Sequence, residues 1–152
     1  MARTRRVSAA QEDYLEAILD LAGETGTVRA GAIARLLSVH KSTVTAALKT
    51  LAAKGLIRYA PYDVASLSVR GKKIAGEITR RHRLIEAFLT EILLLSPEVA
   101  RRNACRMEHA MDSKTLARLA VFAAFIRDHP IAREDWPRHF ALHLTQSSRR
   151  TA

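Results

Sequence analysis

Apolar side chains recur every three or four positions along most of the chain, which is the spacing of amphipathic α-helices. The first such stretch covers residues 8–22, the second covers 28–37 and the third covers 42–54. Gly23 and Gly55 follow the first and third stretches, as expected where a helix ends. Ser42 or a neighbouring residue should cap the third helix. Together, the three stretches predict three consecutive helices.

The second and third helices each present one apolar side. On the second helix we expect Ile33, Leu36 and Leu37 to be buried. The predicted buried side of the third helix is formed by Val44, Ala47, Leu48 and Leu51. Its opposite side carries Ser42, Thr43, Ala46, Lys49, Thr50 and Ala53. That outer side is polar, slightly basic and free of acidic residues, so it suits DNA, although many ordinary surface helices look similar.

Two short β-prone runs follow, at residues 56–59 and 66–69, and Pro61 and Asp63 between them favour a turn. Helix, break, helix and hairpin is the order of a winged helix-turn-helix. The predicted DNA contacts are His40, Lys41, Ser42, Thr43, Thr45, Ala46 and Lys49 on the helix, with Arg58 and Tyr62 on the wing.

The remainder of the chain predicts further helices and a mainly α fold class. We expect a long helix at 71–94, one after Ser96-Pro97 that reaches about residue 111, one at 113–126 capped by Asp112 or Ser113, and a short one at 138–146. This divides the chain into a winged helix-turn-helix domain (1–70), a helical domain (71–146) and a disordered tail (147–152). Residues 1–8 are expected to form a mobile basic arm.

The charge and the length of the chain limit the classes of function that it can have. The chain has 152 residues, with 25 Lys and Arg against 15 Asp and Glu, and a net charge of +10. A basic surface is often only solvated, but on a DNA-binding scaffold it indicates a nucleic-acid partner. No apolar run approaches the roughly 18 residues that span a bilayer, and no signal sequence is evident, so we expect a cytoplasmic protein.

Metal-ligand side chains occur at helical spacing in three places. They are Asp13 and Glu16; His82 and Glu86; and Cys105, Glu108 and His109. The last three share one helix face and combine thiolate, carboxylate and imidazole, which suits a divalent transition metal. Each group also has a simpler interpretation: a solvated acidic face, a helical salt bridge, or a cysteine that only packs.

Five segments, taken together and in order, resemble the diphtheria-toxin-repressor family of iron- and manganese-dependent regulators, in particular its shorter manganese branch. They are Glu-Asp-Tyr-Leu-Glu-Ala-Ile (12–18), Ser-Val-His-Lys-Ser-Thr-Val-Thr (38–45), Gly-Leu-Ile-Arg-Tyr (55–59), Arg-His-Arg-Leu-Ile-Glu (81–86) and Ala-Cys-Arg-Met-Glu-His (104–109). The resemblance covers about residues 12–126.

The resemblance implies a homodimeric transcriptional repressor of metal-homeostasis genes that binds a palindromic double-stranded DNA operator. It implies an N-terminal winged helix and a C-terminal helical metal-binding and dimerisation region, with metal held between the first helix and the dimerisation helices. The implied ligands are Asp13, Glu16, His82, Cys105, Glu108 and His109, with Glu86 a weaker candidate. One or two Mn(II) or Fe(II) ions would bind per chain.

Two departures from the family affect these expectations. The carboxylate of Asp13 favours Mn(II), whereas the thiolate of Cys105, which stands where manganese regulators of the bacillus type carry a carboxylate, favours Fe(II) or Zn(II). The chain also stops short of the SH3-like domain of the longer iron regulators. We expect a manganese sensor, with an Fe(II)-dependent repressor of iron-uptake genes as the alternative.

Two further alternatives remain open. A winged-helix regulator of a non-metal ligand would share the basic charge and the hairpin, but would leave the acidic and thiol groups unexplained. An enzyme is not expected, because the sequence has neither a Gly-rich phosphate loop nor a nucleophile paired with a base in a strand-turn-helix setting.

Overall fold

The computed structural model describes residues 7–59, 64–128 and 137–143. The chain divides into two compact units, residues 1–80 and 81–152. The mainly helical fold class is confirmed, with one small two-stranded sheet. No helix within the described residues is both long and apolar enough to cross a membrane. The domain boundary expected at residue 70 stays a prediction, and the tail at 147–152 lies outside the described residues.

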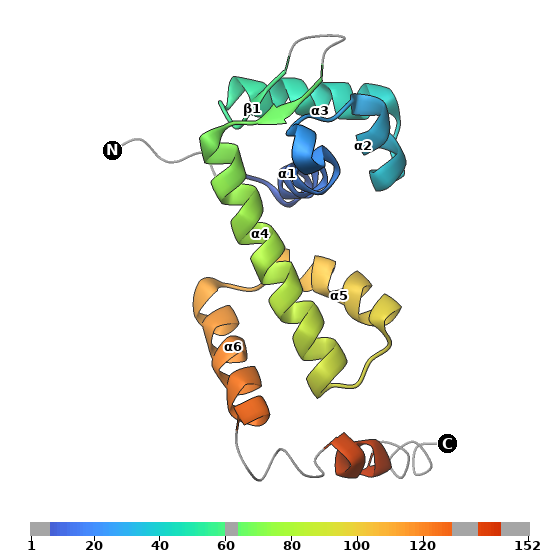
Figure 1. The fold of residues 1–152 in the computed structure, drawn as a ribbon, viewed down its shortest axis with the longest axis vertical. Helices are drawn as coiled ribbons and strands as arrows, with labels where there is room; N and C mark the ends of the chain where they lie inside the picture. Colours follow the sequence, from blue (N-terminus) through green and yellow to red (C-terminus); the bar gives the residue numbers. More distant parts are fainter. Residues whose placement is uncertain (1–6, 60–63, 129–136, 144–152) are drawn as a thin grey trace. The chain divides into compact units, whose positions relative to one another are not determined.

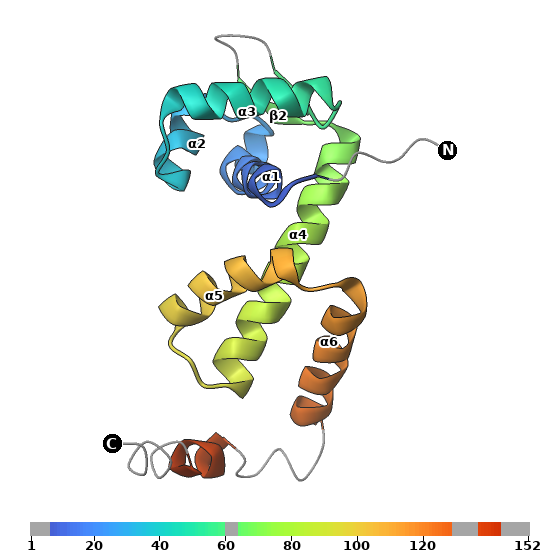
Figure 2. The ribbon, with the colours of Figure 1, turned by 180° about the vertical axis from the view of Figure 1, so that it is seen from behind.

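Three helices form most of the first unit (Figures 1 and 2). They are α1 (Ala9–Ala22), α2 (Ala30–Leu37) and α3 (Lys41–Ala53), with a short 3-10 turn η1 (Gly23–Thr25) after α1. Ser8 caps α1 in a reciprocal pair: the Gln11 backbone N–H donates to Ser8 Oγ, and the Ser8 N–H donates to Gln11 Oε1. The residue ranges predicted for α1 and α3 lie close to these observed ranges.

Three details of the predicted helices were wrong. Helix α2 begins at Ala30 rather than at residue 28, because Val28 exchanges two 2.8 Å backbone hydrogen bonds with Ala65 in an antiparallel bridge. Leu36, expected in the core, is 51% exposed, whereas Ile33 is fully buried. Helix α3 is capped by the backbone of His40 without any side-chain hydrogen bond, so Ser42 is not its cap.

The predicted hairpin is present in shortened form. Strand β1 (Ile57–Arg58) pairs antiparallel with β2 (Ser66–Leu67), in the register Ile57 opposite Leu67 and Arg58 opposite Ser66. Residues 60–63 of the predicted turn, which include Tyr62, lie outside the described residues. The second strand stops at Leu67, because Ser68 turns the chain into the next helix.

Helix α4 (Val69–Ala87) begins directly after the hairpin, and its residues belong to both units. It starts two positions before the predicted residue 71 and is regular only as far as Ala87, where the five-residue π-helix η2 (Phe88–Ile92) continues it. The chain then turns at Leu94, which has a left-handed φ of 55°. The single helix predicted over 71–94 is thus an α-helix followed by a π-helical turn.

In the second unit, α5 (Pro97–Ala110) and α6 (Ser113–Asp128) lie on either side of the C-terminal part of α4 (Figures 1 and 2). Ser96 caps α5 with Pro97 at its first position, as predicted. Residues 137–143 are also helical, which agrees with the start of the helix predicted at 138–146. The core of this unit is formed by Ile85, Leu89, Ala100 and Ala104.

Asp112, one of the two residues predicted to cap α6, does so and gives the second unit a pH-dependent stability. The pKa of Asp112 is lowered, first because the Thr115 backbone N–H donates a 2.8 Å hydrogen bond to its carboxylate. A carboxyl pKa that is lower in the folded state stabilises above the unfolded value of 3.8, and this contribution is lost as pH falls through the folded pKa.

We therefore expect Asp112→Ala to lower the melting temperature at about pH 7 and to have a smaller effect at about pH 2, because the contribution of the charge is lost as the pH falls through the lowered pKa of Asp112. Asp112→Asn, which keeps a capping oxygen, should lie between wild type and Asp112→Ala at the higher pH. Thermal unfolding followed by circular dichroism at both pH values measures this. An equal decrease in melting temperature at both pH values would contradict a role for the charge of Asp112.

Candidate metal centre and nucleic-acid interface

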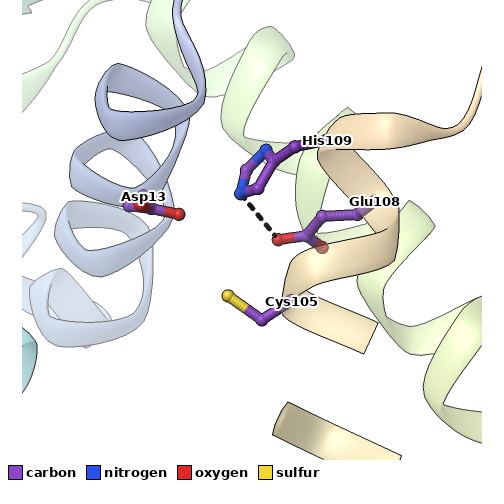
Figure 3. A group of neighbouring side chains, drawn as sticks. All are labelled: Asp13, Cys105, Glu108 and His109. Atoms are coloured by element: carbon purple, nitrogen blue, oxygen red, sulfur yellow. Dashed lines mark ion pairs between the residues drawn. The ribbon is translucent and has the colours of Figure 1, made fainter. Parts of the chain in front are cut away.

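Helix α5 brings Cys105, Glu108 and His109 to one place, as their spacing predicts (Figure 3). One donor atom from each of the three lies within 4.8 Å of the others. Ala100 and Ala104 occupy the same stripe of α5 as Glu108 and are fully buried in the core of the unit. Glu108 continues that stripe and is therefore buried as well, with only 3% of its surface exposed.

Helix α4 supplies an imidazole to the same carboxylate. His82 precedes the core residues Ile85 and Leu89 by three and seven positions, so it lies on the side of α4 that faces the core. Its Nδ1 is 3.0 Å from Glu108 Oε2, and His109 Nε2 is 3.5 Å from Glu108 Oε1. Two helices thus hold two imidazoles against one buried carboxylate.

The buried carboxylate of Glu108 fits a cation. Its Oε1 atom is shielded from solvent and accepts no hydrogen bond from any described residue. A buried charged oxygen without a donor is costly, so this atom is suited to binding a positive ion. The neighbouring thiol and imidazoles are the donor types that bind divalent transition metals, so the residues present fit such an ion.

Glu86 is placed differently from the other sequence-predicted ligands. Its Oε2 is 3.7 Å from His82 Nε2, and its Oε1 is 3.4 Å from Arg101 Nε. Arg101 is a basic residue of α5 that the sequence interpretation did not include. The carboxylate of Glu86 therefore lies between an imidazole and a guanidinium group.

Asp13 and Glu16 belong to the first unit, where they lie three positions apart on α1. Neither is among the buried residues of that helix, which are Tyr14, Leu15, Ala17, Ile18 and Ala22. The side chains of Asp13 and Glu16 are both partly buried. Figure 3 draws Asp13 on α1.

Helix α3 has the two sides that the sequence predicts. Val44, Leu48 and Leu51 are fully buried. The outer side is exposed at every predicted position, namely Ser42, Thr43, Ala46, Lys49, Thr50 and Ala53. His40, Lys41 and Arg58 are exposed too, whereas Thr45 is half-buried and its hydroxyl donates to the Lys41 carbonyl oxygen at 3.0 Å.

A cavity of about 710 Å³ opens beside α3 in the first unit. Among the described residues that line it, four are cationic and none is acidic: the cationic ones are Arg29, Arg35, Lys41 and Lys49. Thr45 and Tyr59 also line it. A concave surface with this much positive charge concentrates field lines and attracts anions such as phosphate.

Arg29, Arg35 and Tyr59 are candidate nucleic-acid contacts that the sequence interpretation missed. Arg29 directly precedes α2, and Arg35 lies near the end of α2. Neither residue lies on α3, whose outer side supplied most of the contacts predicted from the sequence. The available signal was the absence of acidic residues from the whole segment 27–59, in which every charged side chain is basic.

Comparison with known protein families gives one family match for each of the two parts of the chain. Residues 6–65 match the family described as "Iron dependent repressor, N-terminal DNA binding domain". Residues 68–137 match "Iron dependent repressor, metal binding and dimerisation domain". The two matches follow each other without overlap and together include most of the chain.

Individual relatives of the chain are transcriptional regulators, which agrees with the two family matches. The transcriptional regulator MntR of Escherichia coli O6:H1 is 41% identical over 111 residues, which cover 73% of this chain and 71% of that protein. MntR of Salmonella typhimurium is 40% identical over 123 residues, 81% of this chain and 76% of the relative.

Among solved structures, a manganese-dependent transcriptional repressor in complex with manganese superimposes with a TM-score of 0.69 at 28% identity. The match covers 76% of this chain but 53% of that structure, so the chain spans about half the length of this solved relative. The sequence and structural matches agree with each other, and the chain belongs to the iron-dependent repressor family of transcriptional regulators.

Proposed function

We propose that this protein is a metal-dependent DNA-binding repressor that senses Mn(II) and controls metal-homeostasis genes. The observation that carries the proposal is the buried Glu108 carboxylate, which faces two imidazoles and lies beside the thiol of Cys105. The names of relatives, which include MntR regulators and a manganese-dependent repressor, support manganese as the signal.

The proposed ligands are His82, Cys105, Glu108 and His109 of the second unit, together with Asp13 and Glu16 of α1. The inclusion of Asp13 and Glu16 rests on their donor chemistry and on the family resemblance. A bound divalent cation would neutralise the carboxylates and the thiolate, and would favour the DNA-binding conformation only if it binds that conformation more tightly. The chain's own contribution is to hold the donors in place before the ion arrives.

The DNA is proposed to lie against α3 and the adjacent cationic cavity. His40, Lys41, Ser42, Thr43, Thr45, Ala46, Lys49 and Arg58 are the proposed contacts, with Tyr62 from the wing, as the sequence predicts. Arg29, Arg35 and Tyr59 are added from the cavity. Short hydroxyl side chains would reach base edges while the cations bind phosphates, which makes affinity strongly salt-dependent.

A homodimer is proposed because α6 exposes large apolar side chains. Val121 is 64% exposed, Phe122 48% and Phe125 54%. An apolar surface of this kind is suited to a second copy of the chain, and a two-fold dimer would read a palindromic operator. A cytoplasmic location is proposed with it, since a repressor acts where the DNA is, and no enzymatic activity is proposed.

The thiol of Cys105 favours an Fe(II)-dependent repressor as the second candidate, because soft sulfur prefers Fe(II) to Mn(II). Equilibrium dialysis of metal-free, reduced protein against Mn(II) and Fe(II) under anaerobic conditions tests both candidates. We expect one or two Mn(II) ions per chain. Tighter binding of Fe(II) would favour the iron candidate, and failure to bind either ion would contradict metal sensing.

The cavity gives a prediction about salt. Arg29→Gln and Arg35→Gln should each weaken binding to all DNA sequences and reduce the slope of log K against log salt concentration by about 1, since each removes one phosphate contact. Fluorescence anisotropy with a labelled duplex at several salt concentrations measures the slope. Arg118→Gln on α6 removes the same charge outside this surface and is the control. Slopes equal to that of the control would rule out the proposed contacts.

A further inference from the structure

Glu86 carries two contacts that compete with direct metal binding. Its Oε1 lies 3.4 Å from Arg101 Nε, so this oxygen already faces a positive charge. Its Oε2 lies 3.7 Å from His82 Nε2. The carboxylate is itself only half-buried, with 26% of its side chain exposed, in contrast to 1% for Glu108. Glu86 therefore has neither the burial nor the unsatisfied oxygen that makes Glu108 suited to an ion.

The imidazole of His82 lies between two carboxylates, one at each ring nitrogen. Nδ1 faces Glu108 Oε2 at 3.0 Å, and Nε2 faces Glu86 Oε2. A carboxylate opposite one nitrogen of a metal-binding histidine favours the tautomer with the proton on that nitrogen. Glu108 is the nearer of the two and lies at hydrogen-bond distance, whereas 3.7 Å to Glu86 is too long for a hydrogen bond, so without an ion Glu108 favours the proton on Nδ1. A cation bound by Glu108 and by the lone pair of Nδ1 would move the ring proton to Nε2, where the carboxylate of Glu86 favours it.

We propose that Glu86 and Arg101 are positioning residues of the metal site and that Glu86 is not itself a ligand. Arg101 holds the Glu86 carboxylate, and Glu86 holds the His82 ring with Nδ1 directed toward Glu108. The inference rests on the proposed metal-sensing function and assigns separate roles within it. It adds Arg101 to the site and changes the role expected for Glu86.

The exposure of Arg101 makes this role separable from fold stability. Its side chain is 72% exposed, and exposed ion pairs contribute little to folding. Loss of the pair should therefore leave the melting temperature nearly unchanged while releasing the orientation of His82. Removal of a residue that orients a metal ligand typically weakens metal binding 10- to 100-fold.

The test compares Glu86→Gln, Arg101→Gln and the double variant with wild type, using Mn(II) binding to metal-free, reduced, full-length protein in equilibrium dialysis. We expect each single variant to bind the same number of ions as wild type, about 10-fold more weakly. The double variant should be no weaker than the weaker single one, because the two residues act in series. Arg102→Gln, which removes the same charge from the next exposed position, should match wild type.

Three results would overturn the inference. Loss of one bound ion per chain in Glu86→Gln would make Glu86 a ligand. Affinities of both single variants equal to that of Arg102→Gln would remove the positioning role. Additive losses in the double variant would show that the two residues act independently. If wild type bound no Mn(II), the proposed function itself would fail, so the two failures are distinguishable.

Discussion

Replacing Glu108 by Gln should weaken Mn(II) binding by more than about 100-fold, because this change removes the one buried charge of the site. An amide keeps the shape of the side chain but offers one oxygen instead of two and no negative charge. It would also be placed beside His82 and His109 without the charge that attracts them. Equilibrium dialysis of reduced, metal-free protein against Mn(II) measures the loss.

The matched control is Glu91→Gln, which removes the same charge from an exposed position in the same unit. We expect this variant to bind Mn(II) like wild type. If Glu108→Gln retained affinity within about threefold of Glu91→Gln, the buried carboxylate would not be a metal ligand, since removal even of an outer-shell residue costs about 10-fold. Melting temperatures of the two variants separate loss of binding from loss of folding.

Gly71→Ala should destabilise the first unit by about 1–3 kcal/mol. A Cβ atom at this position would collide with the carbonyl oxygen of Leu56. That oxygen cannot move easily, because the Ser68 N–H and the Ser68 hydroxyl both donate to it at 2.9 Å. The Gly71 N–H in turn donates to Ser68 Oγ at 3.0 Å. The absence of a side chain at Gly71 is therefore what lets α4 begin so close to β1.

Gly76→Ala in the same helix provides a control of opposite sign. A Cβ atom there would meet nothing within 4 Å, so alanine should stabilise α4 by about 0.4–1 kcal/mol. Thermal unfolding followed by circular dichroism should show Gly71→Ala melting below wild type and Gly76→Ala at or above it. Equal melting temperatures for the two variants would contradict the close contact between α4 and Leu56.

Local patterns predicted those parts of the fold that local interactions decide. The Ser96-Pro97 start of α5 was predicted correctly, and Asp112 was one of the two residues predicted to cap α6. Both features depend on residues within a few positions of one another. The start of α2 was wrong because Val28 pairs with Ala65, 37 positions away in the sequence. The π-helical turn after Ala87 likewise left no mark in the periodicity.

In the candidate metal site, too, the arrangement of residues within one helix could be predicted from their spacing, whereas contacts between two helices could not. Helical spacing predicted that Cys105, Glu108 and His109 share one face, since that depends on α5 alone. The 3.0 Å approach of His82 to Glu108 depends on how α4 packs against α5, and the sequence could only suggest it through a family resemblance. The pairing of Arg101 with Glu86 was missed, because two residues on different helices give no signal in spacing.

The most direct test of the account is the effect of Mn(II) on DNA affinity. A duplex would be selected from a random pool in the presence of Mn(II), and its dissociation constant measured with Mn(II) and with chelator at one fixed salt concentration. We predict binding tighter by about 5- to 150-fold with Mn(II), the range typical of coupling between two sites on one protein. Identical binding curves with Mn(II) and with chelator would contradict the metal-dependent switch and leave a DNA-binding protein with a different signal.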